Sequence, residues 1–152
     1  MVQVDARHAA LFMVVACLVG AIFGSAVTFA VLQRSYSISN VAQVKAVGVE
    51  IYSDAQLSVL VSRIDWGVVE PGGSKSFVAY VKNSGNSPVF LSLQASDWQP
   101  SNASLVMHVS WDVGNASLDA GRFVVVTFKL VVDSAVLGID VFAFTIVVTG
   151  SG

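Results

Sequence analysis

The most constraining feature of this sequence is a long uncharged run near its start. Residues 9–32 are 24 consecutive uncharged residues, nearly all strongly apolar. As a helix this run would be about 36 Å long, and the hydrocarbon core of a bilayer is about 30 Å thick. A cleaved signal peptide has a shorter apolar stretch, of about 7–15 residues. The run therefore predicts a retained transmembrane helix over 9–32, behind an N-terminal flank of residues 1–8.

Two ways of processing this run stay open. Cys17 follows Val14, Val15 and Ala16 in the pattern of a lipoprotein, whose cysteine is acylated, but the residues after it are apolar where a lipoprotein has a polar tether. Cysteine otherwise behaves as a small apolar side chain. The run also resembles the leader of type IV filament subunits, although residues 7–9 lack the basic-glycine junction of such leaders.

Small side chains recur at every fourth position within the run. They are Ala16, Gly20, Gly24 and Thr28, and they include a G-x-x-x-G motif. On a helix this spacing places them on one face, where a second membrane helix can approach closely. The spacing predicts a helix–helix packing face, with the general abundance of glycine in membrane helices as the alternative.

Two N-glycosylation sequons indicate how the chain is oriented in the membrane. The charges that flank the run do not decide the orientation, because Arg7 lies on one side and Arg34 and Lys45 lie on the other. The sequons begin at Asn102 and Asn115, in segments expected to be loops. N-linked glycans are added to exterior domains, although such tripeptides also arise by chance. We therefore expect a single-pass glycoprotein of the cell membrane, with its C-terminal domain outside.

After the run, the sequence predicts a tether and then an all-β domain. Residues 33–43 are polar and serine-rich without apolar periodicity, which is typical of a tether. Residues 44–152 alternate apolar and polar positions with a period of two. Seven strands are expected, which suits a β-sandwich ectodomain. They cover residues 45–52, 58–64, 75–82, 88–95, 105–111, 122–132 and 141–149.

Each predicted strand has one face that should form the core, and the third and fourth should pair as a hairpin across the turn 83–87. The core positions include Phe77, Ala79, Val81, Val89, Leu91, Leu93, Val124, Val126, Phe128, Leu130, Val132, Phe142, Phe144, Ile146 and Val148. Apolar residues on the opposite faces predict a contact with another chain, with the covering of a second core as the alternative. These are Val125, Val131, Val141, Ala143 and Val147.

Several segments carry a family resemblance. They are residues 64–75 (IDWGVVEPGGSK), 81–86 (VKNSGN), 97–100 (DWQP) and 109–112 (VSWD). Together they resemble a recurrent archaeal module found in membrane-anchored surface proteins. The resemblance covers residues 44–152. It implies a small immunoglobulin-like β-sandwich behind one N-terminal membrane segment, and it implies no catalytic residue.

The composition provides poor material for an enzyme. Eight Lys and Arg against ten Asp and Glu give a net charge of −2, which argues against nucleic-acid binding, and the single cysteine excludes an internal disulfide. His108 is the one histidine of the domain and lies within a predicted strand without partners. Residues 67–74 imitate a phosphate loop but lack its lysine. We expect no catalytic residue, no cofactor and no small-molecule ligand.

Two groups of residues are candidate binding sites. Carboxylates flanking several strands would meet at one end of the sandwich and could hold Ca²⁺, although Asp is common at strand ends for local hydrogen bonding. These candidates are Asp65, Glu70, Asp97, Asp133 and Asp140. Trp66, Trp98 and Trp111 could stack on sugars, but large aromatic side chains more often close an open core. Structural packing is therefore the favoured interpretation.

These observations predict a non-enzymatic cell-surface protein. One membrane helix would anchor a sandwich that mediates protein–protein or envelope interactions. The expected partners are the lipid bilayer and either another protein or a second copy of the chain. The alternatives are a pilin-like filament subunit and an accessory subunit of a membrane complex. An intrinsic hydrolase comes last, because no triad or metal set can be assembled from these residues.

Overall fold

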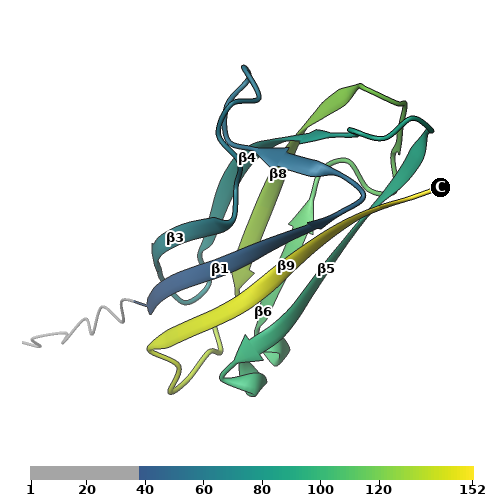
Figure 1. Cartoon of the computed structure of the whole chain (residues 1–152). Helices are drawn as coiled ribbons and strands as arrows, with labels where there is room; N and C mark the ends of the chain where they lie inside the picture. Colours follow the sequence, from purple (N-terminus) through teal and green to yellow (C-terminus); the bar gives the residue numbers. More distant parts are fainter. Residues whose placement is uncertain (1–37) are drawn as a thin grey trace, which may run out of the picture. The chain divides into compact units, whose positions relative to one another are not determined.

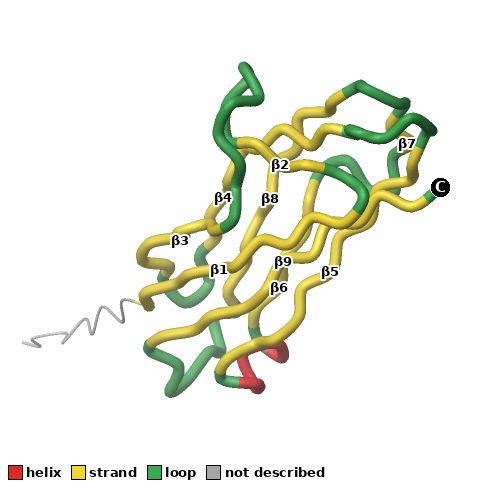
Figure 2. Tube along the Cα trace, viewed as in Figure 1, coloured by secondary structure: helices red, strands yellow, loops and turns green. Residues whose placement is uncertain are grey.

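A computed structural model describes residues 38–152 as two β-sheets packed face to face (Figures 1 and 2). The five-stranded sheet has the order β3 (Arg63–Val69), β1 (Ile38–Val47), β9 (Val141–Ser151), β5 (Val89–Gln99) and β7 (Ser117–Leu118). The four-stranded sheet has the order β2 (Glu50–Tyr52), β4 (Ser74–Lys82), β8 (Phe123–Val132) and β6 (Met107–Trp111). A short 3-10 helix, η1 (Ser101–Leu105), lies between β5 and β6. The predicted all-β sandwich is confirmed. The described residues form nine strands where seven were expected, and the predicted strand 45–52 is divided between β1 and β2, which belong to different sheets.

The predicted membrane span is not part of this description. Residues 9–32 lie outside the described residues, together with Cys17 and the small side chains proposed for helix packing. Within residues 38–152, no helix is long and apolar enough to cross a bilayer.

The core contains the inward faces that the alternation predicts, together with residues outside the predicted set, such as Trp66, Met107 and Ile139. Phe128, Leu130, Phe142 and Ile146 are all at most 1% exposed. The remaining predicted core positions are either buried or half-buried against this cluster. Because successive side chains of a strand point to opposite faces, period two was sufficient to identify the inward side chains predicted in β4, β5, β8 and β9.

The first strand begins earlier than expected. Residues 38–43, expected to belong to the tether, form the first half of β1, and Asn40 and Ala42 are fully buried there. β1 pairs antiparallel with β3 and parallel with β9, so the backbone on both of its sides takes part in sheet hydrogen bonding. This pairing favours a strand even where the side chains are polar, and the expected start of the domain at residue 44 was too late.

The predicted hairpin is wrong, because β4 and β5 belong to different sheets. The chain between them is held by the fully buried side chain of Asn83. Its Nδ2 donates to the carbonyl oxygens of Ser87 at 2.8 Å and Leu118 at 3.0 Å, and its Oδ1 accepts from the Gly85 N–H at 2.9 Å. These contacts fix a crossing between the two sheets in place of a tight turn.

The predicted strand at 58–64 is also wrong over most of its length. Only residues 63 and 64 belong to β3, which continues to Val69 through residues outside every predicted strand. Asp54 organises the preceding loop, because its Oδ1 accepts from the N–H groups of Ser58 at 3.1 Å and Val59 at 2.7 Å. The side chain thus supplies hydrogen bonds that a strand partner would otherwise provide.

Candidate functional surfaces

The five candidate calcium ligands are exposed and take part in no common site. Asp65 Oδ1 accepts from the Gly67 N–H and Asp133 Oδ1 from the Ala135 N–H, both at 2.8 Å. Asp97 has a positive φ of 54° in an irregular part of β5 and accepts from the Ser96 hydroxyl. In the described part of the chain, no three His, Cys, Asp or Glu side chains are grouped so that they could hold a metal ion. The carboxylates of Asp65 and Asp133 serve local turns instead, as the alternative interpretation expected.

The aromatic candidates belong mainly to the core. Trp66 is buried at 4% exposure, and Trp98 lies nearly parallel to Phe144 with ring centroids 4.3 Å apart. Trp111 is half-buried against Phe128. The structural interpretation of the tryptophans is confirmed for these contacts, and His108 is an exposed strand residue as expected.

Both sequon asparagines are exposed, but they lie at opposite ends of the sandwich. Asn102 is in η1, beyond the end of β5, and Asn115 precedes β7, which pairs with the beginning of β5. Exposure makes both side chains sterically available for a glycan.

One group of exposed and half-buried apolar side chains covers the outer face of the four-stranded sheet, with Tyr52 and Tyr80 half-buried. Leu60, Tyr52, Tyr80 and Val125 form a row, because each is the direct cross-strand partner of the next. We call the row and its apolar neighbours the outer patch. Its members are Tyr52, Leu60, Val78, Tyr80, Phe123 and Val125. Leu60 is 63% exposed, and Val78, Phe123 and Val125 are each about half exposed.

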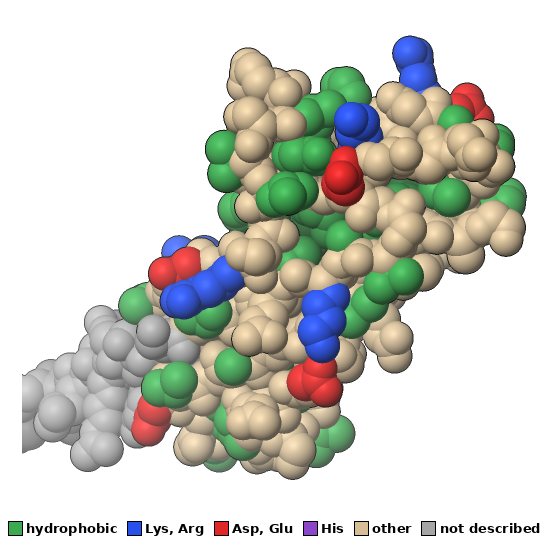
Figure 3. Space-filling view, viewed as in Figure 1, with side chains coloured by type: hydrophobic (Ala, Val, Ile, Leu, Met, Phe, Trp, Pro, Cys, Tyr) green, Lys and Arg blue, Asp and Glu red, His purple; other side chains and the backbone are tan. Residues whose placement is uncertain are grey.

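The outer patch has a polar rim. Lys82 and Glu50 pair directly across β4 and β2, and Lys129 is exposed on β8. Hydrogen bonds from the hydroxyls of Ser84 and then Tyr52 lower the pKa of Glu50. The bond to Glu50 conversely raises the pKa of Tyr52. In Figure 3, viewed from the side of β1 and β9, the near sheet is mostly tan, whereas hydrophobic side chains gather beside residues 53–62. An apolar centre with charged groups at its edge is typical of a protein interface.

The outward residues predicted as a contact surface do face outward, but they belong to two different faces. Val125 is exposed and Val131 half-buried on the four-stranded sheet. Val141 and Ala143 are exposed and Val147 is half-buried on the five-stranded sheet. The tyrosines that join Val125 were missed, although period two in residues 50–52 and 74–82 would have placed them.

A second group of exposed apolar side chains lies where β1 begins. Ile38 pairs with Val69 and Ser39 with Val141, while backbone hydrogen bonds join Gly73 to Val132 and Val106 to Asp133. We call this end the N-terminal pole. It comprises the turn 70–73, η1, the loop 133–140 and the first residues of β1 and β9.

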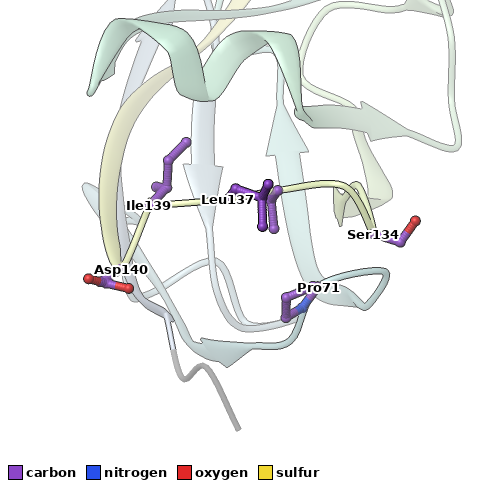
Figure 4. A pocket seen from close by; sticks show the side chains of 7 residues that line it. Pro71, Ser134, Leu137, Ile139 and Asp140 are labelled. Atoms are coloured by element: carbon purple, nitrogen blue, oxygen red, sulfur yellow. The ribbon is translucent and has the colours of Figure 1, made fainter. Parts of the chain in front are cut away.

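The N-terminal pole contains a shallow cavity of about 200 Å³. Pro71 and residues of the 133–140 loop, including Val136, Leu137 and Ile139, line it. Figure 4 shows Pro71 on one side of the cavity and Leu137 and Ile139 on the loop across from it. Most of the wall is apolar, and Ser134 and Asp140 add a hydroxyl and a carboxylate at its edge.

The carboxylates with lowered pKa values predict how stability depends on pH. Burial raises the pKa of Asp54, but hydrogen bonds from Val59 and Ser58 outweigh this effect and lower it below its usual value. The Thr127 N–H donates to Asp112 at 2.8 Å and lowers the pKa of Asp112. A carboxyl whose pKa is lower in the folded state stabilises the fold fully above its ordinary pKa of about 4, and this contribution is lost as the pH falls. Denaturation midpoints should therefore be flat from about pH 5 to 8 and fall below about pH 4.

The matched variant for this prediction is Asp54→Asn. It removes the ionisable group, so the protein should be less stable at neutral pH and its acid decline should be shallower. Equal acid slopes for the variant and the parent protein would contradict the assignment.

No protein-family model matches this chain, and no curated protein matches it.

Proposed function

We propose that this chain is a non-enzymatic, single-pass membrane protein whose immunoglobulin-like sandwich is held outside the cell and binds another protein through the outer patch. Residues 9–32 would form the anchor, because an uncharged run of this length suits a bilayer span. The strand arrangement supports an immunoglobulin-like sandwich, since two sheets of four and five strands are joined by connections that cross between them.

The outer patch is the observation that carries the binding proposal. Tyrosine and phenylalanine are enriched in the centres of interfaces, where a large rigid ring can be buried with little loss of conformational entropy. Here Tyr80 and Phe123 lie with ring centroids 6.1 Å apart, between exposed valines and a charged rim. Isolated exposed apolar residues need no explanation, but a cross-strand row of them marks an interaction site.

Two kinds of partner follow from the same surface. A second copy of the chain would make the protein a filament subunit or a homo-oligomer, and a different protein would make it an accessory subunit of a membrane complex. In neither case does the sandwich itself perform chemistry, and no cofactor is required.

Photo-crosslinking in the membrane of the producing cell tests this proposal. A benzophenone amino acid replaces Val125 in the outer patch, and in a matched protein it replaces Ser92, which is exposed on the outer face of β5. We expect one discrete crosslinked product from position 125 and none from position 92. Mass spectrometry of that product then distinguishes a second copy from a different protein.

Two results would contradict the proposal. Failure of position 125 to crosslink to any protein would show that the outer patch faces solvent. Equal products from both positions would show random collision in the membrane instead of a specific interface.

A further inference from the structure

We propose that the N-terminal pole lies against the lipid surface of the membrane, with Leu137, Leu105 and Val141 in the interfacial layer. The inference rests on the proposed function, since it takes residues 9–32 as the membrane span. It adds a second contact to the molecule, because the outer patch would bind protein while this pole contacts lipid.

The exposure of the pole is the first observation. Leu137 is 88% exposed and Leu105 is 77% exposed, the two highest values among the large apolar side chains that the structure describes. Val141 at 65% and Val68 at 48% extend the same end. Leu105 ends η1, Leu137 lies in the 133–140 loop, and the two valines lie near the end of β3 and at the start of β9. Strand pairing and backbone hydrogen bonds bring these segments together at one pole.

The length of the intervening chain identifies the occupant. Only residues 33–37 separate the end of the apolar run from the beginning of β1 at Ile38. Five residues extend to about 18 Å at most, and the polar layer on each side of a bilayer is about 5–8 Å thick. The pole would therefore be held within about 10–15 Å of that layer. The length of the connecting chain therefore places the N-terminal pole nearest to the lipid. The same pole carries the two most exposed leucines of the described residues.

The charges around the pole define the kind of lipid surface that fits. Glu70, Asp133 and Asp140 are exposed there. The cations closest to them in the sequence are Lys129, four residues before Asp133, and Lys75, five residues after Glu70. An anionic headgroup layer would repel these carboxylates, so attraction to negative lipid does not hold the pole in place. The contact we propose is insertion of apolar side chains into an uncharged or zwitterionic interface, with the carboxylates still hydrated at its edge.

The short helix η1 adds a consequence for glycosylation. In a 3-10 helix, side chains three residues apart lie on the same side, so Asn102 shares the side of Leu105. A glycan on Asn102 would stand between Leu105 and the membrane. Detection of a glycan at Asn102 in the native protein would therefore overturn the proposal.

Site-directed spin labelling of the full chain in phosphatidylcholine nanodiscs tests the contact. The native cysteine is removed by Cys17→Ser, and a nitroxide is attached to Leu137→Cys at the pole. The matched control is a nitroxide at Phe90→Cys, which is 61% exposed where β5 begins, at the opposite end of the sandwich. Collision rates are measured with oxygen, which is enriched in lipid, and with a water-soluble nickel chelate.

We expect the ratio of oxygen to nickel collisions to be several-fold higher at position 137 than at position 90. Equal ratios in a chain that has entered the nanodisc would overturn this inference and leave the anchor intact. A chain that does not enter the nanodisc would overturn both. A further outcome is that the nitroxide at position 137 is shielded from the nickel chelate only in nanodiscs that hold several copies of the chain. That result would assign the pole to contact between chains and would also overturn the lipid contact.

Discussion

Phe128→Ala should lower the free energy of unfolding by about 3–5 kcal/mol, the largest loss that we expect from a single side chain. Phe128 is fully buried in the middle of β8, opposite Phe77 on β4 and Trp111 on β6. Truncation removes apolar surface from the core and leaves a cavity that the paired strands on both sides cannot close. Chemical denaturation of the full chain in detergent micelles, followed by tryptophan fluorescence, measures the change.

The neighbouring residue provides the control for this prediction. Lys129 is next in the same strand and exposed on the outer face, so Lys129→Ala should change the free energy of unfolding by less than about 0.5 kcal/mol. Phe128→Leu, which restores most of the volume, should recover much of the loss. A cost below about 1 kcal/mol for Phe128→Ala would show that position 128 is not in the core.

Asn83→Ala should lower the free energy of unfolding by about 2–4 kcal/mol, because it leaves one buried and two part-buried backbone groups without partners. The Asn83 side chain makes hydrogen bonds with three backbone groups, on Gly85, Ser87 and Leu118. The Leu118 bond joins β7 to the crossing between β4 and β5, across 35 residues of sequence. The same denaturation measurement detects the loss. A smaller slope of the free energy of unfolding against denaturant concentration would indicate that the β7 region has already opened in the folded state.

Asn86→Ala is the matched control, since Asn86 lies in the same connection and is exposed. It should behave as the parent protein does, within about 0.5 kcal/mol. If the two asparagine variants lost equal stability, composition of the loop and not the buried hydrogen bonds of Asn83 would explain the effect.

The candidate surfaces were only partly predictable. Alternation correctly placed Val125 and Val141 outside, because side-chain direction in a strand depends on position parity alone. It did not show that Val125 joins Tyr80, Tyr52 and Leu60, because that row depends on which strands are neighbours. The N-terminal pole was missed for the same reason, since Leu105 and Leu137 are far apart in the sequence. Leu105 was expected to begin a strand but ends η1, and Leu137 lies in a connection without periodicity.

The short elements were also not predicted from the sequence. β7 has two residues and η1 has five, and neither is long enough to display a period. The start of β1 was hidden by its polar side chains, and its pairing with β3 and β9 makes it a strand. Asp54 had the opposite effect, since one side chain turned an apparently strand-like segment into a loop.

The amino-acid sequence by itself determined the local properties of this protein: an uncharged run long enough for a membrane, an all-β domain after it, and the inward face of each long strand. These follow from hydropathy and from a period of two, which act over a few residues. The tertiary structure decided the pairing. Within residues 38–152 the odd-numbered strands form one sheet and the even-numbered strands the other, so no two consecutive strands pair. The physical reason is that pairing depends on packing and buried hydrogen bonds between distant segments, such as the contact of Asn83 with Leu118, which no local pattern encodes.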